Sequence, residues 1–488
     1  MSSIKKAPII LTSRTDVSNS VNKSRRQFIR QALSLSALGG VGAFPGISLA
    51  QGTGFAAVNK PILAHIMMDG GPDMRHLFPP AYNPNGGSYG NAYWEARARA
   101  HSIASNNTAY EARWNDDYFH LTYGGTPFGI LNSCEWLHDM WIDGKVAIIC
   151  NMLADDSRDH DKATRNMERG VRLGEKFQDG SGWGGRLAHA ASGNSIALTN
   201  SPRLFSFGPD ASDLSDLTLV DNTDMLPIAD MRQVGLPDVN DNGYFDNRAY
   251  VTRAVKHYYA ERRATISSDS VFHQFVEHDR KLREFAELID ARLVNVEVPA
   301  AINALWDETS PISGWQARQF RNLYDAIACN DILSMQVASL DYGGWDTHDN
   351  QRDEIEPRLN GLFANNGALK ALYDSLPTDA RANTVFCLSG EFGRQLRDNG
   401  GNGTDHGEGN IAILIGDAVD GGLYGEMFPN SEIPKMAQPN TDTDGLTGFE
   451  HIYAAICEWV SPGSANQVFP GYASAPIESG VNFSSLLS

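Results

Sequence analysis

The chain has 488 residues, enough for one large domain or two of ordinary size. Its formal net charge of -19 excludes nucleic acid and anionic lipid as partners, because both are bound through clustered Lys and Arg. The acidity has two readings, solubility or the binding of divalent cations by some of the carboxylates. None of the five cysteines falls in a C-x-x-C pair, which excludes a thiolate zinc site but leaves one disulfide open.

A targeting segment opens the chain. Residues 24–30 read S-R-R-x-F-I-R, residues 31–47 are weakly apolar, and small side chains precede Ala50. Together they predict a twin-arginine signal peptide over residues 1–50, cleaved after Ala50. We therefore expect export by the twin-arginine translocase to the periplasm or the medium, with one α/β domain at 51–488. No later stretch reaches about 18 apolar residues, so no stable membrane insertion is expected.

Apolar runs of strand length alternate with helical patterns along the rest of the chain. This alternation predicts an α/β fold, with a mostly parallel central sheet covered by helices on both faces. The expected strands are residues 60–68, 145–152, 203–207, 332–340, 382–388 and 411–416. The expected helices are residues 131–143, one or two over 250–294, and then 315–329, 355–376 and 449–460.

Residues 181–310 are interpreted as a loop-rich and helical insertion. The helical periodicity of 250–294 predicts a cap or an outer layer. Residues 238–246 match the first nine positions of a calcium-binding loop, D-x-N-x-N-G-x-x-D. The twelfth position, where a bidentate acid belongs, is Ala249, so an ordinary Asn-Gly turn is the alternative reading.

Acids and imidazoles recur beside the ends of the expected strands. The carboxyl ends of parallel strands meet at one edge of a sheet, so side chains distant in sequence can converge there. Carboxylates with imidazoles suit zinc, manganese or iron, and two such ions can assist a phosphoryl-type displacement. For each motif alone, a turn with a hydrogen-bonded histidine is the alternative. The candidate ligands are Asp69, Asp73, His160, Asp346, His348, Glu391, Asp405 and His406.

An ordered set of motifs resembles a known family, domain of unknown function 1501. The motifs are G-G-P-D at 70–73, G-W-G-G-R at 182–186, G-W-D-T-H at 344–348, S-G-E-F-G-R at 389–394, G-T-D-H-G at 403–407 and F-P-G at 469–471. Members of that family are typically exported by the twin-arginine route. The family is similar in outline to the alkaline phosphatase and sulfatase superfamily, which implies an alkaline-phosphatase-like fold with one or two metal ions.

The resemblance also implies roles for single residues. Asp69 or Asp73 is the first acid, Asp346 and His348 hold one metal, Glu391 replaces an Asp-His pair, and His406 is the late histidine. Asp159 stands at the position of the superfamily's Ser or Thr nucleophile, with Ser157 two residues earlier. Arg158 or Arg394 would clamp a tetrahedral anion through paired N–H groups.

Two functions remain open at this point. The first is an exported metal-dependent hydrolase of phosphate or sulfate esters, acting on a small molecule or a polysaccharide. Departures from the family pattern at Asp159, Glu391 and Glu408 favour the second, a non-catalytic ligand-binding, polysaccharide-binding or assembly protein with a degenerate metal site. An oxidoreductase, suggested only by the export route, lacks a G-x-G-x-x-G turn and a C-x-x-C-H motif.

Overall fold

The computed structural model of the chain describes residues 54–84, 88–155, 157–171, 181–199, 201–209, 225–233, 247–267, 270–307, 310–312 and 314–488. The expected signal peptide at 1–50 and the calcium-like loop at 238–246 lie outside these ranges. Within them, no helix combines the length and the apolar character needed to cross a bilayer.

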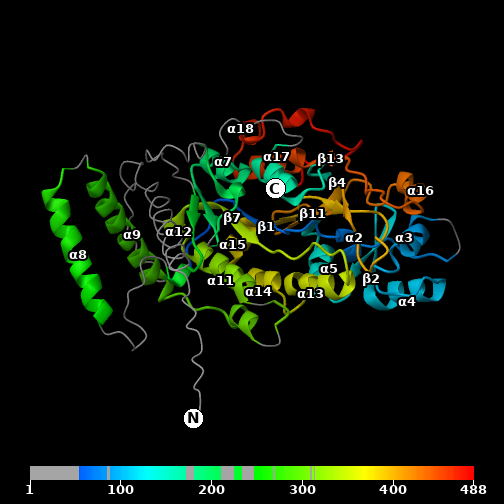
Figure 1. The fold of residues 1–488 in the computed structure, drawn as a ribbon, viewed down its shortest axis with the longest axis horizontal. Coiled ribbons are helices and arrows are strands. Elements are labelled where there is room, and N and C mark those ends of the chain that lie inside the picture. The colour runs from blue at the N-terminus through cyan, green and yellow to red at the C-terminus, as the bar shows by residue number, and fades with distance from the viewer. Residues whose placement is uncertain are drawn as a thin grey trace, which may run out of the picture.

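Nine strands of the described chain form one central sheet (Figure 1). They are β1 (Ile62–Met67), β4 (Val146–Leu153), β5 (Asn194–Ala197), β6 (Met225–Pro227), β7 (Met335–Asp341), β8 (Thr384–Ser389), β11 (Gly409–Ile415), β12 (Gly422–Tyr424) and β13 (Thr447–Gly448). The strand order is β12-β4-β11-β8-β1-β7-β5-β6, with β13 beside β4. Strand β1 lies parallel between β7 and β8, and all of its residues are buried. The prediction of a mostly parallel α/β sheet is confirmed.

Strand β11 is the exception to the parallel arrangement. It runs antiparallel to β4 and β8, so its first residue, Gly409, lies opposite Leu153, the last residue of β4. The start of β11 therefore lies at the same edge as the carboxyl ends of β1, β4, β7 and β8. Asp405 and His406 precede their strand, whereas the other candidate ligands follow theirs. Only this reversal brings all of them to one edge.

Helices cover both faces of the sheet, as a buried parallel sheet requires. The longer ones are α3 (Tyr89–Arg97), α4 (Asn107–Asp117), α5 (Glu135–Ile142), α6 (His160–Arg169), α7 (Trp183–Ala190), α8 (Asn247–Thr265), α9 (Val271–Leu293), α11 (Gly314–Ala328), α13 (Gln351–Phe363), α14 (Ala368–Ser375) and α17 (Phe449–Val460). The short ones are α2 (Met74–Leu77), α10 (Ala300–Asn303), α12 (Asn330–Leu333), α15 (Thr378–Ala382), α16 (Ile433–Met436) and α18 (Ala465–Val468).

The two faces carry separate cores. Helices α7, α17 and α18 lie on one face, and α11, α13 and α14 lie on the other (Figure 1). Leu187 and Ile456 pack in the first core, and Phe320 and Leu362 pack in the second. All five cysteines are buried and unpaired, so the disulfide that the sequence left open is not formed. Packing on both faces therefore fixes the positions of the strand ends that carry the candidate site.

Residues 88–131 contain structure that the hydrophobic pattern did not predict. They form α3, α4 and a hairpin of β2 (Tyr118–Tyr123) and β3 (Thr126–Leu131). A second small ladder pairs β9 (Gly393–Arg394) with β10 (His406–Gly407), setting His406 opposite Arg394. This ladder brings the two motifs of residues 389–394 and 403–407 together.

Two expected elements were wrong in type or extent. The strand predicted at 203–207 is a 3-10 turn, η3 (Leu204–Ser206). Its neighbour Phe207 accepts a hydrogen bond from the amide of Gly182, so this segment is tied to the start of α7 rather than to a strand. The helix predicted over 355–376 is two helices, α13 and α14, because the Asn-Asn-Gly sequence at 365–367 interrupts it.

Part of the range 181–310 belongs to the central sheet and its helical layer. It supplies α7 to one face of the sheet and β5 and β6 to its edge, where β5 pairs with β7. Helices α8 and α9 lie side by side at one end of the molecule, on the left in Figure 1. Among the described residues, neither helix contributes to the pocket at the candidate site, so the structure does not confirm a helical cap over it.

Candidate metal centre

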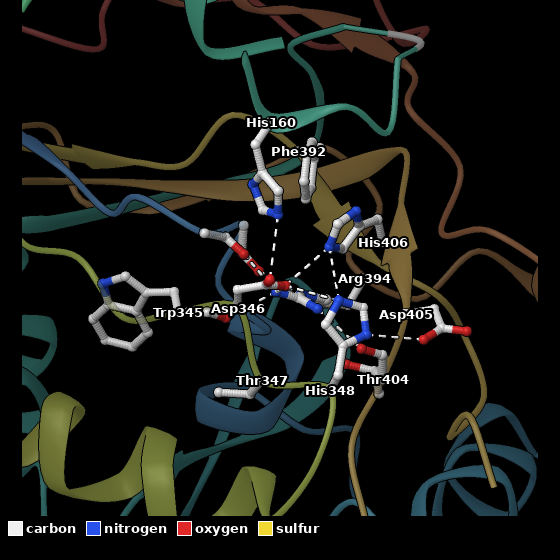
Figure 2. A network of polar contacts seen from close by, with 12 residues as sticks. His160, Trp345, Asp346, Thr347, His348, Phe392, Arg394, Thr404, Asp405 and His406 are labelled. Atoms are coloured by element: carbon white, nitrogen blue, oxygen red, sulfur yellow. Dashed lines mark hydrogen bonds and ion pairs between the residues drawn. The ribbon is translucent and has the colours of Figure 1, made fainter. Parts of the chain in front are cut away.

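Three imidazoles and one carboxylate converge at the carboxyl edge of the sheet (Figure 2). His160 begins α6 after β4, Asp346 and His348 follow β7, and His406 lies in β10 before β11. Ligand atoms of His160, Asp346 and His406 lie within 4.8 Å of one another. The Nε2 atoms of His348 and His406 each lie 2.9 Å from Asp346 Oδ1 and 2.9 Å from each other. All four side chains are partly exposed, so the centre is open to solutes.

Glu391 fixes the first imidazole. Its carboxylate is fully buried and accepts the Gly70 amide at 2.9 Å and the Nδ1–H of His160 at 2.7 Å. Because Nδ1 donates, Nε2 carries the lone pair, and it faces Asp346 Oδ2 at 3.4 Å. This buried Nε2 has no hydrogen-bond partner in the described part of the chain. The hydrogen bond to Glu391 raises the pKa of His160.

The other two imidazoles are held in the same way. Nδ1 of His348 donates to Asp405 Oδ1 at 2.9 Å, and Nδ1 of His406 donates to the backbone carbonyl of Arg158 at 2.8 Å. Each Nε2 is thereby left as an acceptor directed at the centre. An acceptor on the far nitrogen is the usual support of a metal-binding histidine.

The arrangement fits a divalent cation. Two nitrogen lone pairs 2.9 Å apart repel each other unless a proton or a cation lies between them. Ligand atoms about 2.1 Å from one ion, at angles of about 90–109°, are about 3.0–3.4 Å apart. The separations of 2.9 Å and 3.4 Å in this cluster are close to that range. Three imidazoles with one carboxylate suit zinc, manganese or iron.

Arg394 supports the centre from behind. Its guanidinium is buried and donates to Asp346 Oδ1 at 2.8 Å. Burial would raise the pKa of Asp346, but the neighbouring His406 imidazole and the Arg394 guanidinium outweigh it and lower the pKa to about 2. Arg394 also donates to the backbone carbonyls of Gly70, Gly71, Trp345 and Thr404. With its donors bound to these acceptors, the geometry does not favour the predicted anion clamp.

Close packing fixes the rings of the site. The buried ring of Phe392 lies against both His160 and His406, with centroids 4.9 Å and 4.6 Å away. Gly70 has a φ of +119°, and a Cβ added there would lie 2.5 Å from the amide nitrogen of Asp346. The Gly-Gly turn after β1 is therefore required for the loop of Asp346 to approach this closely.

The two acids after β1 have different surroundings. Asp73 is buried, forms an ion pair with Arg97 of α3, and accepts a hydrogen bond from Gln351 at 2.7 Å. Asp69 is half-exposed and lies 3.3 Å from Arg203. Among the described contacts, neither carboxylate bonds to the three imidazoles. Asp69 faces the pocket beside the centre, whereas Asp73 stabilises the loop.

The loop before α6 uses its polar groups locally. Asp159 is the N-cap of α6 and accepts the amide of Lys162 at 2.9 Å. The Oγ of Ser157 accepts the amide of Asp159 at 3.2 Å, and Arg158 forms an exposed ion pair with Asp442. In the part of the chain that is described, none of these three side chains bonds to an imidazole of the centre.

A pocket of about 630 Å³ adjoins the centre. Three arginines in its wall were not among the predicted site residues. Two of them, Arg165 and Arg169, are four residues apart on α6, the helix that begins at His160. That spacing places both on one face of a helix and was a signal in the sequence. The lining residues are Asp69, Gly70, His160, Asp161, Thr164, Arg165, Glu168, Arg169, Arg203, Leu204, Gly344 and Asp346.

One comparison bears on the loops that supply the centre. Residues 334–432 match a family model described as Protein of unknown function (DUF1501). The match covers about a fifth of the chain, runs from β7 past β12, and includes Asp346, His348, Glu391 and His406. It supports the family resemblance of the motifs in that stretch. No curated protein matches the chain.

Proposed function

We propose that this chain is a metal-dependent hydrolase of phosphate or sulfate esters, on an alkaline-phosphatase-like fold. One observation carries the proposal. Ligand atoms of His160, Asp346 and His406 lie within 4.8 Å of one another, His348 Nε2 lies 2.9 Å from both Asp346 Oδ1 and His406 Nε2, and each imidazole is held by an acceptor on Nδ1. An acceptor on Nδ1 of every imidazole is the support that metal-binding histidines usually have. The adjoining pocket gives the ester a place to bind.

His160, Asp346, His348 and His406 would hold the ion. A divalent cation bound there would polarise the ester oxygen and stabilise the developing negative charge. Glu391 and the other Nδ1 acceptors keep the imidazoles in the tautomer that leaves Nε2 unprotonated.

Water is the proposed nucleophile. Ser157 and Asp159 are engaged in the turn before α6 and make no contact with the imidazoles among the described residues. Asp69 lines the pocket together with His160 and Asp346, so it is the carboxylate best placed to accept a proton from the attacking water. The water oxygen would bond to phosphorus or sulfur as the bond to the ester oxygen breaks, and the proton accepted by Asp69 would pass through solvent to the leaving alkoxide.

Metal analysis and turnover test this proposal together. Purified protein should contain stoichiometric metal and hydrolyse aryl phosphates or sulfates when zinc or manganese is supplied. His348→Ala should lose both properties, whereas His257→Ala, which removes an exposed histidine of α8, should keep them. Protein without bound metal and without activity on either ester class would contradict the proposal.

The engagement of Ser157 and Asp159 in a local turn favours a second candidate, a non-catalytic ligand-binding or assembly protein. Stoichiometric metal with no turnover of any ester would favour this candidate over the hydrolase.

The location of the protein is proposed from the leader alone. Residues 1–50 would direct the folded chain through the twin-arginine translocase to the periplasm or the medium. Replacement of Arg25 and Arg26 by Lys should leave the protein in the cytoplasmic fraction, and normal export of that variant would contradict the assignment.

A further inference from the structure

The pocket beside the metal centre extends along one side of α6. His160 begins the helix, and Asp161, Thr164, Arg165, Glu168 and Arg169 contribute to the pocket wall from successive turns. Residues spaced by three or four positions share one face of a helix, so this wall continues away from His160. The pocket therefore has a near end at the metal centre and a far end at the last turn of α6.

The three arginines of this wall differ in their ion pairs. Arg203 is bound by carboxylates, since it forms ion pairs with Glu168, Asp69 and Asp341. The described residues provide no ion pair for Arg165 or Arg169. The Nε of Arg169 is buried and has no hydrogen-bond partner among them. The far end thus offers two guanidinium groups with donors left for an outside acceptor.

Arg165 and Arg169 lie some distance along α6 from the metal centre, where the ester would be cleaved. With a rise of about 1.5 Å per residue, Arg165 and Arg169 lie about 7.5 Å and 13.5 Å from His160 along the helix axis. A phosphate or sulfate group at the centre is only a few bond lengths across. Arg169 in particular is too far along the helix to bind that same group, so its partner must be another part of the ligand.

We propose that the substrates carry a second anionic group, a sulfate, phosphate or carboxylate, which binds to Arg165 and Arg169 while the ester lies at the metal centre. This inference rests on the proposed function for the ester and on the pocket geometry for the second group. Guanidinium groups bind such oxyanions through paired N–H donors, so these residues would select polyanionic esters over simple ones.

The test measures binding rather than turnover, so it does not depend on hydrolysis. Biphenyl disulfonate and biphenyl monosulfonate are titrated calorimetrically into the full mature protein, because neither compound can be hydrolysed. Wild-type protein should bind the disulfonate at least about tenfold more tightly than the monosulfonate. The double variant R165Q/R169Q should bind the two compounds equally.

Two further variants control for folding and for general charge. R165K/R169K keeps the positive charges and should retain part of the preference. K162Q removes an exposed lysine from the same helix, outside the pocket, and should keep all of it. Equal binding of both compounds by wild-type protein, or an unchanged preference in R165Q/R169Q, would overturn the inference. An arginine-dependent preference in a protein that hydrolyses no ester would sustain the anion site and overturn the proposed function alone.

Discussion

Glu391 gives the sharpest test of the metal centre, because it makes no direct contact with the proposed ion. Its buried carboxylate holds two donors, Nδ1–H of His160 at 2.7 Å and the Gly70 amide, which lies 2.9 Å and 3.2 Å from the two oxygens. Glu391→Gln keeps the volume and one oxygen. It removes the charge and places an NH2 group 3.2 Å from the amide of Gly70, donor against donor.

The expected effect falls on metal affinity. Loss of an outer acceptor of a ligating histidine typically weakens metal binding about 10–100-fold, which is about 1.4–2.8 kcal/mol. We expect Glu391→Gln to lie within this range, because the amide oxygen can still accept from His160 but no longer enforces the tautomer through a charge. The remaining ligands are untouched, so the metal stoichiometry at saturation should stay at the wild-type value.

The assay is a competition titration of zinc or manganese against a chelator of known affinity. Glu432→Gln is the matched control, since Glu432 is equally buried but pairs with Arg75 away from the centre. That variant should lower the unfolding temperature without changing metal affinity. If Glu391→Gln binds metal as tightly as wild type, the carboxylate does not orient a ligand and the metal centre as described is wrong.

Three other predictions concern the centre and its supports. His348→Ala should weaken metal binding more than Glu391→Gln does, because it deletes a ligand atom; metal analysis after dialysis measures this. Asp73→Asn should lower the free energy of unfolding by about 3–5 kcal/mol, because it leaves the buried Arg97 without a carboxylate partner. Denaturant unfolding measures this change, and the metal content should stay the same. Burial would raise the pKa of Glu356, but His76 and Arg113 lower it to about 2 from its ordinary 4.5. The stability from this shift is present above pH 4.5 and lost as the pH falls toward 2, so Glu356→Gln should flatten part of the acid-side decline in unfolding temperature.

Each of these outcomes has a clear opposite. Full metal content in His348→Ala would remove that residue from the ligand set. Loss of metal in folded Asp73→Asn would restore the first-acid role that the family resemblance implied for Asp73. An unchanged acid-side profile in Glu356→Gln would show that the buried pair with His76 does not contribute to acid stability.

The sequence indicated the edge of the sheet where the three imidazoles and Asp346 lie, because Asp346, His348 and His160 come in the loops after apolar runs of strand length. The pattern could not separate the proposed ligands from their supports. Glu391 and Asp405 have the same residue types and locations as ligands, yet they bond to Nδ1 atoms rather than face the common point. That distinction depends on side-chain direction, which spacing alone does not determine.

Other errors came from elements without a clear hydrophobic period. Asp73 is paired with Arg97, which lies on α3, and α3 was not predicted because its few apolar residues do not form a regular stripe. The direction of β11 was also not readable, since an apolar run such as residues 411–416 fits a parallel or an antiparallel position equally well. Arg165 and Arg169 were missed although their spacing of four residues was a signal, because no helix was predicted over 160–169 to place them on one wall with His160.

The short ladder of β9 and β10 has a consequence for how the chain tolerates change. Side chains alternate between the two sides of a strand, so a single residue inserted within β10 would turn the imidazole of His406 away from Asp346. The turn between the two strands is fixed as well, because Asn399 donates to the backbone carbonyl of His348 at 2.8 Å and Asp405 accepts from Nδ1 of His348 at 2.9 Å. An insertion on either side of His406 would therefore move one of the imidazoles, so the spacing of residues from Asn399 to Gly409 is constrained as a unit.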